Sequence, residues 1–167
     1  MLDNARKYID VLKNKFLDIW YDNDYKYYFC NDYHNSIELP DNDFNEMHFV
    51  SLDSSYNVIG YISYSVHRGT NSAYNLGIMN FSKDNKFIFG KDVYKVIDDI
   101  FTKFNMQRLE FSVVVGNPIE KSYDRMIEKY NGRIVGIRKR AVKLADNKLY
   151  DEKIYELLNE DYLSGKI

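Results

Sequence analysis

The 167-residue sequence predicts an α/β (α+β) fold, in which a mixed and mostly antiparallel central sheet carries helices on both faces. Three observations predict it. Residues 48–81 contain apolar segments separated by turn residues, the pattern of an antiparallel meander. Residues 90–136 then alternate helix, strand, helix and strand, and residues 133–158 have the pattern of a closing hairpin.

The composition predicts one cytoplasmic domain spanning residues 1–167. Apolar residues make up 45% of the chain, which is enough for a sizeable core. No apolar run approaches the roughly 20 residues that a membrane span requires, and residues 1–7 lack the apolar core of a signal peptide. Cys30 is the only cysteine, so an internal disulfide and a cysteine-rich zinc site are both excluded.

The net charge of −2 is unevenly distributed. Residues 18–46 contain eight acidic residues and one basic residue, whereas residues 121–148 contain nine basic and three acidic residues. Both regions are typical of solvated surfaces, or of an acidic rim for a cationic amine and a basic region for phosphates. The basic residues 138–140 would face both sides of a strand. With the negative net charge, this predicts no nucleic-acid binding.

The N-terminal half predicts one helix and three strands. A helix is expected over residues 2–20, because apolar residues recur there at alternating steps of three and four. They are Leu2, Ala5, Ile9, Leu12, Phe16 and Ile19. Residues 21–46 are aromatic and acidic, with an irregular end around Pro40. Strands are expected at 48–52, 58–66 and 74–81.

The C-terminal half is more regular. An amphipathic helix follows Gly90 and ends near Phe104, and a nearly continuous apolar strand covers 109–115, as expected when both of its faces are buried. Asn117 is expected to cap the next helix, with Pro118 in its first turn and Glu120 reaching back. A hairpin at 133–158 and a short, frayed end complete the chain. Two helix N-termini thus follow buried strands, which is where open α/β sheets hold anionic ligands.

This order resembles the GNAT superfamily of N-acetyltransferases, in particular its ribosomal-protein and amino-sugar branch. The resemblance rests on Gly90 and its helix, the strand Arg108–Val113, Asn117, and the closing strand within 147–158, with a weaker match over 58–81. It implies a GNAT-like fold and direct acetyl transfer from acetyl-CoA to a primary amine of a small molecule or protein N-terminus. It also implies a monomer or homodimer.

The resemblance implies a donor site at the first helix of this pair. The family's pyrophosphate loop, Arg/Gln-x-x-Gly-x-Gly/Ala, matches residues 85–90, where only Gly90 is retained and Ile88 replaces the first glycine. A Cβ there should crowd the phosphate, although Lys83 adds positive charge. The implied coenzyme-binding residues are Ile78, Met79, Asn85, Lys86, Phe89, Gly90, Lys91 and Asn117. The alternative is a catalytically weak or inactive GNAT-fold binding or regulatory module.

The resemblance also implies catalytic candidates. Tyr123 would protonate the departing thiolate, with Tyr130 as a second candidate, although Tyr123 also fits a core position. The base is Glu110 acting through water, or His67, whose imidazole suits proton transfer near neutral pH. A base-free mechanism through water is equally tenable.

For the acceptor, the resemblance implies a site along residues 20–29, at Trp20, Asp22, Asp24 and Tyr25. The alternative is that this segment only packs the N-terminal helix on the sheet. His34 and His48 have no carboxylate or cysteine partner at metal-ligand spacing, so no metal site is expected.

Overall fold

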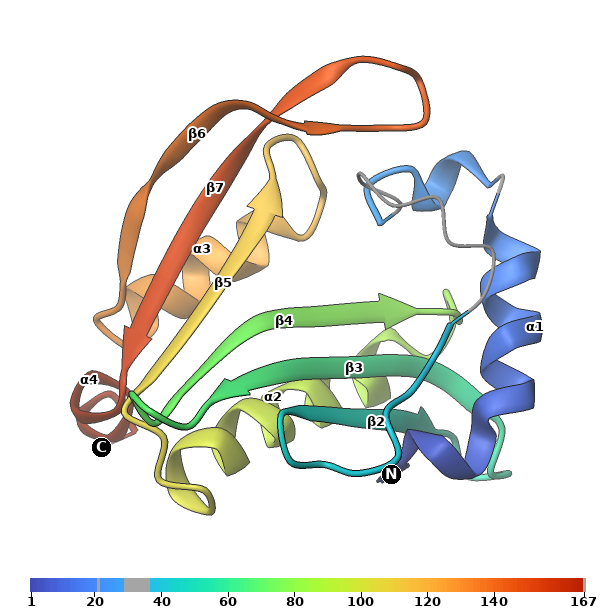
Figure 1. The fold of residues 1–167 in the computed structure, drawn as a ribbon, viewed down its shortest axis with the longest axis horizontal. Coiled ribbons are helices and arrows are strands. Elements are labelled where there is room, and N and C mark those ends of the chain that lie inside the picture. Colours follow the sequence, from blue (N-terminus) through green and yellow to red (C-terminus); the bar gives the residue numbers. More distant parts are fainter. Residues whose placement is uncertain (21, 29–36, 167) are drawn as a thin grey trace.

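The computed structural model describes residues 1–20, 22–28 and 37–166, which contain one seven-stranded sheet (Figure 1). Its strand order is β1-β2-β3-β4-β5-β7-β6. The strands are β1 (Leu2–Asn4), β2 (Glu46–Leu52), β3 (Val58–His67), β4 (Ser72–Asn80), β5 (Arg108–Val114), β6 (Arg133–Lys143) and β7 (Leu149–Leu158). Neighbours are antiparallel except β4 and β5, which are parallel, so the predicted mixed sheet is confirmed.

Helices pack on both faces of this sheet, as predicted. They are α1 (Ile9–Ile19), α2 (Lys86–Thr102), α3 (Glu120–Lys129) and α4 (Asn159–Ser164), with short 3-10 helices at Ala5–Tyr8 and Asn23–Tyr25. The larger core lies between the sheet and α2, α3 and α4, and the smaller one lies under α1. Alternate residues of β3 belong to different cores, because Ile62 and Tyr64 face α2 whereas Tyr61 faces α1.

A glycine in β3 lets α2 approach the sheet. A Cβ at Gly60 would lie 2.3 Å from two ring carbons of Phe89, so this position admits no side chain without displacing that ring. Phe89 is buried in the first turns of α2. The beginning of α2 therefore packs closely on β3, because the Phe89 ring occupies the space that a side chain at position 60 would fill.

Three element boundaries differ from the sequence prediction. Leu2–Asn4 pairs with β2 as a strand, so helical structure begins only at Ala5. The apolar spacing there misled because Leu2 faces the α2 core while Ala5 belongs to the core under α1. The C-terminal end is also ordered as α4, because the buried ring of Tyr162 stacks on Phe101 with centroids 4.6 Å apart. Lastly, α2 begins at Lys86, before Gly90 rather than after it.

The sheet splits between β4 and β5. Their parallel pairing joins only Ser72–Tyr74 to Arg108–Glu110, and the strands then diverge (Figure 1). The divergence begins at Asn75, which has φ of 55° and coincides with a register shift against β3. An asparagine tolerates this left-handed backbone better than most residues. Past this bulge, the edge of β4 that faces β5 pairs with no strand among the described residues.

Candidate functional site

A cavity of about 620 Å³ opens where β4 and β5 diverge. Its walls come from four parts of the chain: the end of β4, the first turns of α2, the beginning of α3 and residues 24–28. Ile78, Phe89 and Met126 contribute apolar surface, while Asp24 and Asn117 contribute polar groups. A largely apolar cavity with few polar groups is the usual form of a coenzyme or small-molecule site.

The N-terminus of α2 forms one side of the cavity. The first intrahelical bond runs from Phe89 N–H to the Asn85 carbonyl, at 3.0 Å, so the N–H groups of residues 86–88 have no acceptor within the helix. Lys86 and Gly90 line the cavity. Gly90 lies inside the helix, and a Cβ added there would meet nothing within 4 Å. Gly90 therefore does not belong to a loop before the helix, which corrects the register assumed from the sequence.

The beginning of α3 forms the opposite side. Asn117 Oδ1 accepts from the Ile119 N–H at 3.1 Å in the turn before α3, whereas the N-cap position itself is Ile119 and has no side-chain capping bond. Glu120 reaches back as predicted, but its carboxylate accepts from the Gly116 N–H, at 3.0 Å, instead of that of Asn117. Within the described residues, the side-chain NH₂ of Asn117 has no acceptor. Asn117 thus lines the cavity with a donor available to a ligand.

Tyr123 lies in the wall between these two helices. Its side chain packs edge-on against Phe111 and Tyr155, with ring centroids 4.9 and 5.9 Å away. The hydroxyl makes no hydrogen bond with the described residues, and burial raises the pKa of Tyr123 well above its usual range. The second candidate, Tyr130, packs on Tyr162 and accepts from Lys129 Nζ, and it does not line the cavity.

A buried lysine ties α3 to the sheet. Lys153 of β7 lies 2.6 Å from Asp124 Oδ1 and 3.3 Å from Glu120 Oε1, and Tyr155 donates to the same Asp124 oxygen at 2.8 Å. The hydrogen bond from Lys153 lowers the pKa of Asp124. Because Glu120 also holds the Gly116 N–H, this network positions the end of the cavity formed by α3.

Replacing Lys153 with methionine should lower stability at neutral pH and flatten the acid limb of the stability curve. The lowered pKa of Asp124 stabilises the fold above the unfolded-state pKa of about 4, and this contribution is lost as pH falls through the folded-state pKa. Urea unfolding between pH 3 and 7 measures the effect. Lys139→Met, which removes an exposed pair with Asp151, should change the curve less because solvent screens that pair. Equal acid slopes in wild type and Lys153→Met would contradict this role.

Several predicted donor and acceptor residues do not line the cavity. Met79 is buried under α1, Lys91 is exposed, and Asn85 Nδ2 donates to Ser82 Oγ at 2.9 Å. Asp22 caps the short helix over 23–25, and Trp20 does not line the cavity either. By contrast, Ile78, Lys86, Phe89, Gly90, Asn117 and Tyr123 all line the cavity.

In the predicted acceptor segment, only Asp24 of the four named residues reaches the cavity, and it pairs with Lys83. Tyr25 belongs to the core under α1. Tyr21 and residues 29–36, which include Cys30 and His34, lie outside the described residues. Tyr27 and Tyr28, which lie within the predicted segment but were not among its four named residues, line the cavity as well.

The two predicted bases lie in a different hollow, of about 250 Å³, at the junction of β4 and β5. His67 Nδ1 accepts from the Thr70 N–H at 3.2 Å and lies 2.9 Å from its hydroxyl, so it stabilises the turn after β3. Glu110 has no ion pair or hydrogen bond with the described residues. Leu109 and Phe111 face the core under α2 and α3, so Glu110 points to the other face of the sheet.

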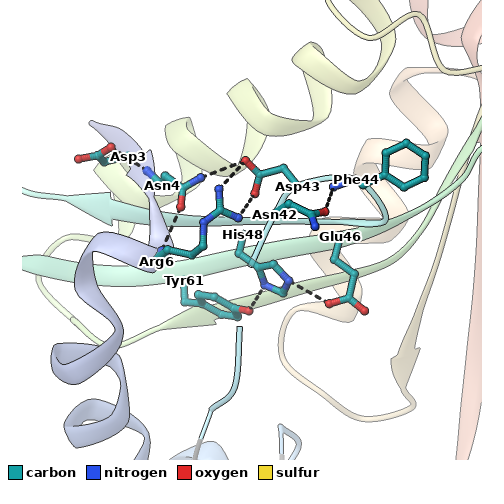
Figure 2. Close-up of polar contacts among 9 residues, drawn as sticks. All are labelled: Asp3, Asn4, Arg6, Asn42, Asp43, Phe44, Glu46, His48 and Tyr61. Carbon is teal, nitrogen blue, oxygen red and sulfur yellow. Dashed lines mark hydrogen bonds and ion pairs between the residues drawn. The ribbon is translucent and has the colours of Figure 1, made fainter. Parts of the chain in front are cut away.

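A hydrogen-bonded network on that other face was not predicted from the sequence. His48 joins the Tyr61 hydroxyl to the Glu46 carboxylate (Figure 2). Glu46 stands two residues before His48 in the same strand, a spacing that does not predict a metal site. Because residues two apart share a strand face, the alternation of β2 was the signal that would have found the pair.

Two further features concern residues 1–20, 22–28 and 37–166 only. No cluster of three or more His, Cys, Asp or Glu side chains there could hold a metal ion. No helix in that part of the chain is long and apolar enough to cross a membrane.

A sheet that splits beside a short parallel pairing, with two helix N-termini facing one cavity, is an arrangement in which α/β proteins hold ligands. Comparison with known proteins specifies it. No family model matches the chain, and no curated protein matches it in sequence. Solved structures do match.

One match is to mutant forms of the spermidine/spermine N-acetyltransferase SpeG from Vibrio cholerae, at 16% identity, a TM-score of 0.75, and coverage of 100% of this chain and 98% of that one. Another mutant of the same enzyme has 17% identity and a TM-score of 0.73, with 100% and 99% covered. A complex of SpeG with manganese ions has 22% identity and a TM-score of 0.60, with 73% and 70% covered. The chain therefore has the GNAT N-acetyltransferase fold.

Proposed function

We propose that this protein is an N-acetyltransferase that transfers the acetyl group of acetyl-CoA directly to a primary amine of a small molecule or protein N-terminus. The observation that carries the proposal is the cavity at the split of the sheet, which two helix N-termini face. The matching structures of spermidine N-acetyltransferase support the reaction class.

The donor would bind across the split. The unbonded N–H groups and positive end of α2, with Lys86 beside them, suit the pyrophosphate. The unpaired edge of β4 and the amide of Asn117 suit the pantetheine arm and the thioester carbonyl. Ile88 does not line the cavity, which supports a phosphate position that its Cβ leaves uncrowded.

The chemistry requires an amine, an acyl group and a proton for the thiolate. The amine nitrogen attacks the thioester carbonyl, the C–S bond breaks, and the thiolate takes the hydroxyl proton of Tyr123. The raised pKa of Tyr123 keeps that proton in place at neutral pH. Glu110, which pairs with no described residue and lies at the junction on the opposite face, would attract the ammonium form of the acceptor.

A second candidate function is a binding or regulatory module that uses the same fold without turnover. One observation favours it. Asp24 brings a carboxylate to the cavity and pairs with the exposed Lys83, so the charge of this lysine is less available to a phosphate.

The two functions are separated by measuring the melting temperature with and without millimolar acetyl-CoA, and coenzyme A release with spermidine and with short peptides. Binding to the native state must raise the melting temperature by mass action. A shift with release on at least one amine is the expected result. A shift without release favours the binding module, and the absence of both contradicts coenzyme use.

A further inference from the structure

The sheet face that carries α1 also carries a hydrogen-bonded chain of three side chains. His48 Nδ1 lies 2.5 Å from the Tyr61 hydroxyl, and His48 Nε2 lies 3.0 Å from Glu46 Oε2 (Figure 2). The exposed fractions of His48 and Tyr61 are 8% and 9%, whereas the Glu46 side chain is 49% exposed. The chain therefore runs from a buried phenol to a carboxylate in solvent.

These hydrogen-bonded side chains extend from β2 to β3, in the direction of the split between β4 and β5. His48 of β2 lies opposite Ser63 of β3, and Ser63 lies opposite Gly77 of β4. The Ser63 hydroxyl leans over Gly77, since a Cβ there would lie 3.0 Å from Ser63 Oγ. Gly77 follows the bulge, where β4 no longer pairs with β5. Tyr61 lies opposite Met79 of the same strand, so its backbone is one strand spacing from the strand whose free edge borders the cavity.

The carboxylate sets the direction of the hydrogen bonds. An ionised Glu46 only accepts, so His48 Nε2 carries the proton and Nδ1 is left to accept from the Tyr61 hydroxyl. This is the order of groups, carboxylate, imidazole and hydroxyl, that lets an imidazole take a proton while the carboxylate stabilises the imidazolium. The Ser63 hydroxyl also lies at the Tyr61 oxygen, to which it can donate a hydrogen bond.

The residues before β2 hold Glu46 in place. Asp43 forms a bidentate pair with Arg6, and the guanidinium of Arg68 donates to the Phe44 carbonyl (Figure 2 shows the Asp43 contact). The Asn45 carbonyl accepts from the Val66 N–H at 2.7 Å. The backbone just before Glu46 is therefore held by contacts on both sides.

We infer that Tyr61, His48 and Glu46 form the proton relay that deprotonates the acceptor amine, an inference that rests on the proposed acetyl transfer. One N–H bond of the ammonium breaks as its proton forms a bond to the Tyr61 oxygen, and the original Tyr61 proton moves to His48 Nδ1. The positive charge passes from the amine to the imidazolium, which Glu46 stabilises. After the product leaves, His48 Nδ1 returns its proton to the Tyr61 oxygen as Tyr61 releases one proton to water, which restores the starting tautomer.

The test compares Tyr61→Phe and His48→Gln with Tyr64→Phe, a buried tyrosine of the same strand that faces the opposite core. Steady-state kinetics use whichever panel amine the wild type acetylates fastest. The two relay variants should lose about a hundredfold in kcat, with KM for acetyl-CoA and its melting shift unchanged, while Tyr64→Phe keeps wild-type kcat. Wild-type kcat in the relay variants, or a change in KM alone, would overturn the relay. So would the same loss confined to Glu110→Gln.

An acceptor-independent measurement completes the test. Nitrogen-15 chemical shifts of His48 report which ring nitrogen carries the proton in the wild-type protein. The relay requires a protonated Nε2 and an unprotonated Nδ1, and the opposite tautomer would overturn it. If the wild type acetylates no amine, the proposed function fails, and this tautomer still decides whether the chain is built to accept a proton.

Discussion

Replacing Tyr123 with phenylalanine should lower kcat of acetyl transfer about a hundredfold or more, while affinity for acetyl-CoA stays close to wild type. The substitution keeps the ring contacts with Phe111 and Tyr155 and removes only a hydroxyl that hydrogen-bonds no described residue. Stability should therefore change little. The lost activity would report the proton that the thiolate no longer receives.

Tyr130→Phe is the matched control, because it removes a buried hydroxyl from the end of the same helix, away from the cavity. We expect that variant to keep its turnover. The raised pKa of Tyr123 adds a further expectation: kcat should show no loss through tyrosine ionisation up to about pH 10. Unchanged kcat in Tyr123→Phe would remove this residue from the mechanism.

Replacing Gly90 with alanine should raise the melting temperature and weaken acetyl-CoA binding at the same time. A glycine inside a helix costs about 1 kcal/mol relative to alanine, and a Cβ here would meet nothing within 4 Å, so the fold should gain stability. The new methyl group would, however, project into the cavity that Gly90 lines. A residue kept only for packing would not show these opposite effects.

Thr102→Ala controls for helix stabilisation, because Thr102 is an exposed residue in the last turn of α2, far along the helix from the cavity. It should stabilise without changing the affinity for acetyl-CoA, measured by calorimetry. If Gly90→Ala binds acetyl-CoA as tightly as the wild type, the coenzyme does not approach the helix at Gly90.

The sequence predicted the sheet and its helices well where one period dominates a long segment. The stripe Val93, Val96, Ile97 and Ile100 is buried in α2, and the inner stripe of α3 is buried as well. The prediction from the sequence failed at Leu2–Asn4, where pairing with β2 outweighs a weak helical spacing. Boundaries depend on partners far along the chain, and local spacing does not contain them.

The candidate site was predicted in part for the same reason. The predicted coenzyme and thiolate-protonating residues that do line the cavity lie on or beside α2, α3 and β4, whose order the sequence already indicated. The contact of His48 with Tyr61 depends on the register between β2 and β3, which only the folded sheet reveals. The turn contacts of His67 likewise depend on how the chain folds back at Thr70.

The short pairing between β4 and β5 has a mechanical consequence. Three residue pairs join the plate formed by β1 to β4 with the plate formed by β5, β7 and β6, so strand pairing between the two is confined to a narrow strip, and the core under α2, α3 and α4 also joins them. A ligand that bonds to both lips of the opening would act as a cross-link between the plates. Occupancy of the cavity would then govern how far the halves of the molecule can flex independently.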